Sequence, residues 1–188
     1  MLCPRCGSSH PMGAAPLIRH HELRSTRGSA QACSYSAPYQ RIAYAHQFES
    51  FCLVIRPTMP VGSVESLAYA IHKGACACLE LDSSDLGVSW RFLNRRTELT
   101  SGKEIVLYDR TPGGAGFVAE AREQWEEVLA RALQICTHCT CETACYECLK
   151  DFGNQFHHDA LNRSSAAEYL SSIGPGGSSG LLTMVSSD

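Results

Sequence analysis

Five cysteines stand within residues 136–149, in the stretch CTHCTCETACYECL. Four of them follow the pattern Cys-x-Cys-x-x-x-Cys-x-x-Cys: Cys139, Cys141, Cys145 and Cys148. Four thiolates this close in sequence can meet around one tetrahedral Zn²⁺, because little loop entropy opposes the closure. Four sulfur ligands leave no position for a water molecule, so the pattern predicts a structural metal site that contributes to folding. An iron–sulfur cluster would use the same four ligands.

The other cysteines of this half of the chain are expected to be packing residues. The four patterned cysteines lie in a polar segment, which argues against their being unliganded core thiols. Cys136 falls on the apolar face of the preceding helix, and Cys52 falls in an apolar strand. Cys76 and Cys78 lie at an alanine-rich helix end. A thiol redox switch built on Cys136, Cys76 and Cys78 remains an alternative interpretation.

A second cysteine pair, Cys3 and Cys6 in CPRCG, has the spacing of a zinc-ribbon knuckle. Such a knuckle needs two further ligands, and no second Cys-x-x-Cys follows in the N-terminal region. The residues that could complete it are His10, His20, His21 and Cys33. The sequence leaves open whether this knuckle binds a second zinc.

Three glycines, Gly113, Gly114 and Gly116, follow the strand that ends at Asp109 and precede a helix. Backbone N–H groups at a helix N-terminus can bind a phosphate. No Gly-Lys-Ser/Thr follows, however, so the stretch is not a P-loop. A tight turn that needs glycine for steric reasons is the alternative.

Polar side chains gather in NQFHHDALNR, just after the cysteine cluster: Asn154, Gln155, His157, His158 and Arg163. Such side chains can contact phosphates or bases. They can also pair with buried backbone groups and lock the helices around the cysteines. The second interpretation is favoured, because no aromatic stacking series and no basic stripe accompanies them.

The elements that must position these residues alternate between strands and helices. Strands are expected within 41–57 and at 86–94 and 103–109, the last two as a hairpin. Helical periodicity predicts helices at 63–77 and 117–136, and two helical pieces within 145–173 broken at 153–154. We expect an α+β fold with a small mixed sheet and a C-terminal four-cysteine zinc knuckle. Residues 1–40 form an irregular segment, 41–173 the domain, and 174–188 a disordered tail.

Composition and charge bound the function. The 188 residues are 44% hydrophobic and 19% charged with a net charge of −3, which is typical of a globular protein. The positive charge is N-terminal: five arginines stand against one acid up to residue 41, namely Arg5, Arg19, Arg24, Arg27 and Arg41. They predict a weak, salt-sensitive contact with nucleic acid. No signal peptide or membrane span is visible, so a cytoplasmic protein is expected.

The order of these motifs resembles the MrfA-like zinc-binding domain over roughly residues 63–170. The resemblance rests on ESLAYAIHKGACACLEL, LYDRTPGGAGF, the four-cysteine pattern and NQFHHDALNR. The family occurs at the C-terminus of superfamily-two DNA helicases, including a mitomycin-repair helicase, and in the DrmB component of DISARM anti-phage systems. Asn162 stands where the family leads us to expect Asp.

The resemblance implies that Cys139, Cys141, Cys145 and Cys148 bind zinc and that Asp109 and the glycines are a family signature. It assigns Asn154, Gln155, His158 and Arg163 to a further family motif. Because 188 residues leave no room for two motor lobes, it implies a separate subunit or a fragment. The expected function is a non-enzymatic module that docks onto a DNA helicase or translocase in anti-phage defence or DNA repair. A metal-dependent nuclease or hydrolase using Asp109, His157 and His158 is the alternative.

Overall fold

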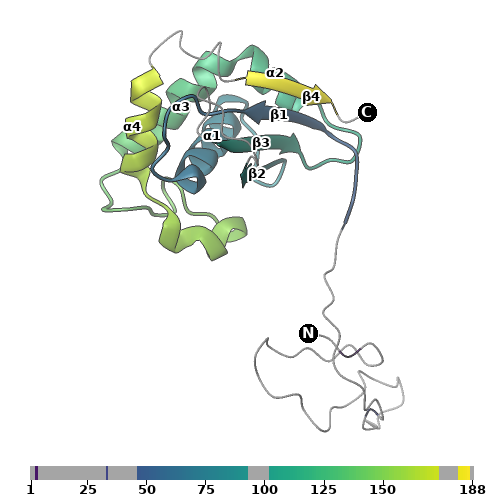
Figure 1. Cartoon of the computed structure of the whole chain (residues 1–188), viewed down its shortest axis with the longest axis horizontal. Helices are drawn as coiled ribbons and strands as arrows, with labels where there is room; N and C mark the ends of the chain where they lie inside the picture. The colour runs from purple at the N-terminus through teal and green to yellow at the C-terminus, as the bar shows by residue number, and fades with distance from the viewer. Residues whose placement is uncertain (1–2, 4–32, 34–45, 93–101, 174–181, 187–188) are drawn as a thin grey trace. The chain divides into compact units, whose positions relative to one another are not determined.

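The computed structural model describes residues 3, 33, 46–92, 102–173 and 182–186 (Figure 1). The chain divides into two compact units, Met1–Gln47 and Phe48–Asp188. The elements of the second unit are β1 (Phe51–Ile55), α1 (Val64–Cys78), β2 (Leu86–Phe92), β3 (Lys103–Asp109), α2 (Phe117–Glu123), α3 (Trp125–His138), the 3₁₀ helix η1 (Phe152–Ala160), α4 (Arg163–Ile173) and β4 (Leu182–Ser186). No helix in the described ranges is long and apolar enough to cross a membrane.

The four strands form one sheet in the order β2-β3-β1-β4. The expected α+β class and the β2–β3 hairpin are confirmed. Every pairing is antiparallel, so the sheet is antiparallel rather than mixed. Strand β4 lies in the stretch expected to be a disordered tail, and the structure differs there because LTMVS pairs with β1 at the sheet edge.

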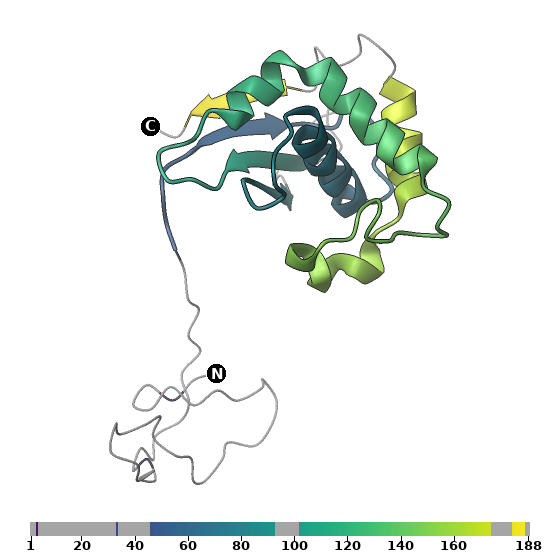
Figure 2. The same ribbon diagram turned by 180° about the vertical axis from the view of Figure 1, so that it is seen from behind.

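Helix α1 packs between the sheet and α3, on the helix-covered face (Figures 1 and 2). It begins as the sequence predicts, because the Ser63 hydroxyl caps it by accepting the N–H of Ser66 at 3.1 Å. Gly74 lets α3 approach closely. A Cβ there would lie 2.5 Å from the Val128 carbonyl oxygen and 2.8 Å from the Ala132 Cβ. The core therefore depends on a small residue at this crossing.

The single helix of about five turns expected from residue 117 is two helices. The chain departs from helical geometry at Gln124, where φ is −100° and ψ is 26°. Helix α2 contacts β1 and β3, whereas α3 contacts α1 and α4. Because of the bend, the apolar side of α2 faces the sheet and that of α3 faces the neighbouring helices. The apolar periodicity continues through both helices, so it does not reveal the bend.

An ion-pair network around a buried glutamate lies in the sheet. The Glu104 side chain is fully buried and accepts bonds from Arg56 Nε at 2.6 Å and from Arg91 Nε at 2.7 Å. Desolvation would raise the pKa of Glu104, but the hydrogen bonds and charges of the two arginines outweigh it and lower the pKa below its usual 4.5. The network ties β3 to the chain after β1 and to β2.

Replacing this carboxylate, Glu104→Gln, should reduce the free energy of unfolding by about 2 kcal/mol at neutral pH, since both arginines are partly exposed and regain water. A depressed folded-state pKa contributes stability above the unfolded-state pKa and loses it as pH falls through the folded-state value. The difference between wild type and variant should therefore vanish in acid, in urea titrations followed by circular dichroism. A difference that does not change with pH would contradict the assignment.

Candidate metal centre

The four cysteines of the Cys-x-Cys-x-x-x-Cys-x-x-Cys pattern come together at the C-terminal end of α3. Cys139 is the C-cap of α3, and the other three lie in the turns that follow it. Their sulfur atoms all lie within 4.8 Å of one another, a geometry able to hold a metal ion. The closest pairs are Cys139–Cys145 at 3.5 Å, Cys141–Cys148 at 3.7 Å and Cys145–Cys148 at 3.9 Å.

These distances fit zinc. Sulfurs about 2.3 Å from a tetrahedral Zn²⁺ stand about 3.8 Å apart along each edge of the tetrahedron. The local backbone also prepares the thiolates: the N–H of Cys145 donates to the Cys148 sulfur at 3.2 Å, and the N–H of Lys150 donates to the Cys145 carbonyl at 2.9 Å. The turn from Cys145 to Lys150 therefore fixes the backbone that carries the Cys145 and Cys148 thiols.

The pKa values of the clustered thiols differ in the absence of a metal. Hydrogen bonds from the backbone N–H and the thiol of Cys141, and from the Cys145 thiol, lower the pKa of Cys139 to about 7. Desolvation raises the pKa of Cys141 to about 12, and desolvation also raises the pKa of Cys148. The Cys139 thiol thus ionises more readily than the thiols of Cys141 and Cys148. A bound divalent cation would stabilise the thiolate form of all of them.

Arg163 ties the cysteine turns to the helices. Its Nε donates to the Cys141 carbonyl at 2.6 Å and its Nη1 donates to the Cys136 carbonyl at 3.1 Å. Its own backbone N–H donates to the Thr143 carbonyl at 2.7 Å. The guanidinium therefore joins the end of α3, the cluster and the start of α4, which matches the locking role favoured from the sequence.

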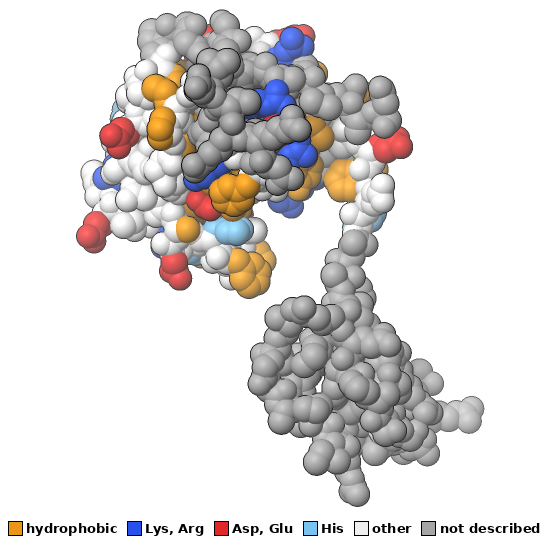
Figure 3. Space-filling model, in the orientation of Figure 1, with side chains coloured by type: hydrophobic (Ala, Val, Ile, Leu, Met, Phe, Trp, Pro, Cys, Tyr) orange, Lys and Arg blue, Asp and Glu red, His pale blue; other side chains and the backbone are white. Residues whose placement is uncertain are grey.

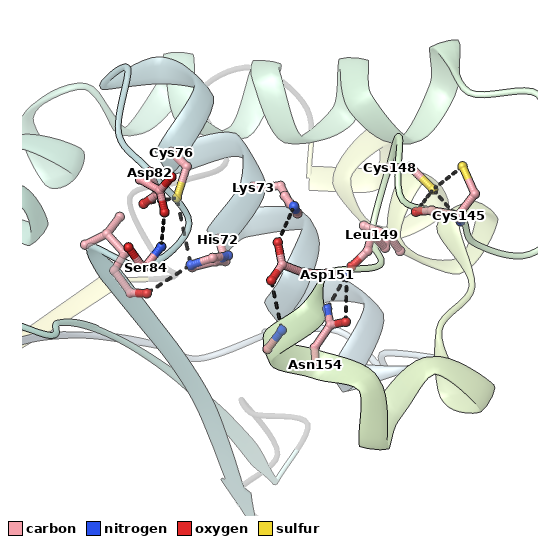
Figure 4. A network of polar contacts seen from close by, with 12 residues as sticks. His72, Lys73, Cys76, Asp82, Ser84, Cys145, Cys148, Leu149, Asp151 and Asn154 are labelled. Atoms are coloured by element: carbon pink, nitrogen blue, oxygen red, sulfur yellow. Dashed lines mark hydrogen bonds and ion pairs between the residues drawn. The ribbon is translucent and has the colours of Figure 1, made fainter.

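Asn154 and His158 join the start of η1 to the chain after the cysteine cluster, and Figure 4 shows Asn154 beside Leu149 and Asp151. The Asn154 amide donates to the Leu149 carbonyl and accepts the N–H of Asp151, both at 2.8 Å. His158 Nε2 lies 2.8 Å from Asn154 Oδ1 and 3.1 Å from the Asp151 carbonyl. Both partners are acceptors, so this nitrogen carries the proton.

The remaining members of the polar motif are also engaged. Gln155 donates to the Phe152 carbonyl at 2.9 Å. The His157 ring packs edge-on against Trp90, with centroids 4.8 Å apart, and lies 6.1 Å from the Tyr69 ring. Neither histidine is paired with a described carboxylate as a nuclease site would require.

Asp151 is a residue that the sequence analysis missed. It caps η1 through Gly153 N–H at 3.0 Å and pairs with Lys73 of α1 at 3.1 Å, as Figure 4 shows. The backbone hydrogen bond from Gly153 lowers the pKa of Asp151, with help from Lys73. The signal that could have found it is Asp at 151 followed by Asn at 154, a capping box.

Asp109 fills the anion-binding position of the glycine loop. Its Oδ2 accepts the N–H groups of Ala115 and Gly116, both at 2.8 Å, and its Oδ1 accepts the N–H of Val118 at 3.0 Å. The carboxylate is fully buried. Because the chain's own carboxylate occupies these donors, the geometry favours a steric turn over a phosphate site.

The glycines of this loop adopt backbone angles that other residues rarely take. Gly113, Gly114 and Gly116 have φ of 84°, 80° and 90°, values that strain other residues. A Cβ at Gly114 would also collide with the Phe51 ring. The loop therefore needs glycine for reasons that involve no ligand.

The other described cysteines of this unit do not form a reactive pair. Cys136 is fully buried, and desolvation raises its pKa to about 12. Desolvation also raises the pKa of Cys76 to about 11 and raises that of Cys78. Cys52 is half-buried in β1. Thiols held protonated in this way react slowly, so the geometry disfavours a redox switch.

Several predicted residues lie outside the described part of the chain. They are Cys6, His10, His20, His21 and the five N-terminal arginines, Arg5, Arg19, Arg24, Arg27 and Arg41. The second metal site and the nucleic-acid contact predicted from them stay predictions.

Known proteins resemble this chain in both sequence and structure. The curated relative Druantia protein DruE of Escherichia coli (strain UMEA 4076-1) is 26% identical over 192 residues, which cover 90% of this chain and 10% of DruE. The chain thus spans about a tenth of the length of that relative. A crystal structure of DUF1998 helicase MrfA bound to DNA matches with a TM-score of 0.45 and 21% identity, over 59% of this chain and 14% of that one. A second, bound to DNA and AMPPNP, matches with the same TM-score and 17% identity, over 84% and 22% of the two chains.

The family model of the MrfA Zn-binding domain matches residues 67–149. This range includes helix α1 from its fourth residue, the hairpin, the glycine loop and all four clustered cysteines. The match and the cluster together confirm the expected zinc cofactor and the resemblance seen in the motifs. Over residues 67–149, the chain is similar to the MrfA Zn-binding domain.

Proposed function

We propose that this chain is a zinc-binding accessory module that docks onto a DNA helicase or translocase, in anti-phage defence or DNA repair. The observation that carries the proposal is the match of residues 67–149 to a domain named for MrfA, which solved structures describe as a DNA-bound helicase. In this role the zinc is structural, held by Cys139, Cys141, Cys145 and Cys148. The remaining parts of the motor come from the partner.

An aromatic surface next to the cluster is the proposed docking site; it consists of Tyr146, Phe152 and Phe156. Their exposed fractions are 66%, 84% and 100%. Figure 3 shows hydrophobic side chains and a histidine gathered at the lower end of the folded unit, where η1 lies. Large exposed aromatic side chains are enriched among the anchors of protein interfaces.

The charge around this surface favours a protein partner over nucleic acid. Residues 142–159 contain four acids and one lysine, and Lys150 is that lysine. Phosphates would be repelled there, whereas a basic protein surface would be attracted. The module therefore reaches DNA through its partner or through its N-terminal arginines.

Phe152→Ser combined with Phe156→Ser should weaken the complex with the helicase that co-purifies from the native host about 30-fold, as expected for the loss of an interface anchor. Size exclusion and calorimetry would measure it, with unchanged zinc content. Phe92→Ser is the matched control, because Phe92 is 70% exposed and its ring lies beside Lys103 of β3, with the Lys103 Nζ 5.7 Å from the ring centroid.

The change that the module causes in the partner's ATPase rate should be reduced by the Phe152→Ser and Phe156→Ser double variant and kept by Phe92→Ser. An unchanged complex in the double variant would contradict this docking site. A co-purifying partner that is not a nucleic-acid motor would contradict the function, as would nucleic-acid cleavage by the isolated chain that depends on His157 or His158.

A further inference from the structure

Two cysteines meet in the N-terminal unit, Met1–Gln47. Cys3 and Cys33 are thirty residues apart in sequence, yet their sulfur atoms lie 3.9 Å apart. Both are buried, with exposed fractions of 1% and 9%. Neither residue lies in the segment matched by the zinc-binding family, which begins at residue 67. Something other than local spacing brings these two thiols together.

The separation distinguishes between two chemical relationships. Disulfide-bonded sulfurs are about 2.05 Å apart. Two sulfurs bound to the same tetrahedral zinc are about 3.8 Å apart, from the Zn–S length of about 2.3 Å. The 3.9 Å between Cys3 and Cys33 equals the separation of Cys145 and Cys148 in the C-terminal cluster. The pair is therefore too far apart for a disulfide, and its separation is that of two sulfurs on one metal or of two thiols in contact.

The composition of this unit supplies a reason for a metal. Residues 1–47 contain no Val, Phe or Trp, and their leucines and isoleucines are Leu2, Leu17, Ile18, Leu23 and Ile42. A unit this small and this poor in large apolar side chains seldom folds on its core alone. A metal ion that binds residues thirty positions apart would supply the free energy of folding that this small apolar core lacks.

We propose that Cys3 and Cys33 hold a second zinc ion, in the N-terminal unit and separate from the cluster at 139–148. Thiolate ligands select zinc over harder divalent cations such as Mg²⁺. Cys6 is the first candidate for a further ligand by its Cys-x-x-Cys spacing, and its placement lies outside the described residues. The proposal does not depend on helicase docking.

Metal analysis of the purified full chain tests this directly. Wild type loaded with Zn²⁺ should contain two equivalents, whereas Cys3→Ser and Cys33→Ser should each contain one. Cys78→Ser, a cysteine of α1 outside both sites, is the matched control and should retain two. With Co²⁺ in place of Zn²⁺, the visible absorption of tetrahedral cobalt should fall by about half in Cys33→Ser.

A measurement on the unmodified chain covers the case in which the variants misfold. Cysteine alkylation mapped by mass spectrometry should leave Cys3 and Cys33 protected until a chelator is added, and then label both. One zinc equivalent in wild type, a Cys3–Cys33 disulfide under non-reducing conditions, or protection that survives chelation would each overturn the second site.

Discussion

Cys148→Ser should lose the C-terminal zinc and with it the ordered structure of residues 139–173. Cys148 is the most buried member of the cluster, at 1% exposed, and its sulfur lies within 3.9 Å of both Cys141 and Cys145. Structural zinc contributes about 10 kcal/mol or more to folding in small metal sites. That contribution is as large as the whole stability of a typical domain. The variant should therefore contain one zinc fewer and aggregate on purification.

Cys78→Ser serves as the control here too, because it removes a thiol and leaves the cluster intact. Its zinc content and thermal midpoint should equal those of wild type. Excess chelator added to Cys33→Ser, in which only the cluster at 139–148 should hold zinc, should remove ordered structure from its circular dichroism spectrum, and added Zn²⁺ should restore it. A Cys148→Ser protein that keeps its zinc and its melting midpoint would show that the cluster needs only three of the four sulfurs.

Asp109→Ala should lower the free energy of unfolding by about 4 kcal/mol. The substitution leaves the N–H groups of Ala115, Gly116 and Val118 without their buried acceptor, and a hydrogen bond to a charged group contributes about 1.5–3 kcal/mol. The three losses are not additive, because the freed loop can admit water. Urea titration at neutral pH would measure the change.

Asp109→Asn should cost less, about 2 kcal/mol, since an amide oxygen still accepts one or two of these bonds. Asp159→Ala, at an exposed position after the cluster, should change stability by less than about 0.5 kcal/mol. If the loop instead serves a phosphate ligand, Asp109→Ala would gain phosphate binding without losing stability. That result would contradict the assignment of Asp109 as the loop's internal anion.

The metal cluster could be predicted from sequence because it is local. All four cysteines fall within ten residues, so their spacing alone brings them together. Helix α1 was predictable for the same reason, since the Ser63 cap and its apolar stripe are read within fifteen residues. The hairpin of β2 and β3 follows from two apolar runs joined by a polar stretch.

Contacts between distant residues could not be predicted in this way. Lys73 and Asp151 are 78 positions apart, and Arg56 and Glu104 are 48 apart. No period or spacing encodes such pairs, because tertiary packing creates them. The bend at Gln124 was missed because no glycine or proline marks it. Strand β4 was missed because it follows a glycine- and serine-rich stretch and has only five residues.

Zinc X-ray absorption spectroscopy is the most direct test of the central claim that the C-terminal site is a closed structural centre. The Cys33→Ser variant is the sample of choice, because only the cluster at 139–148 should then contribute. We expect four sulfur ligands at about 2.3 Å and no nitrogen or oxygen in the first shell. A shell of three sulfurs and one nitrogen or oxygen would contradict the account, because one of the four cysteines would then not be a ligand.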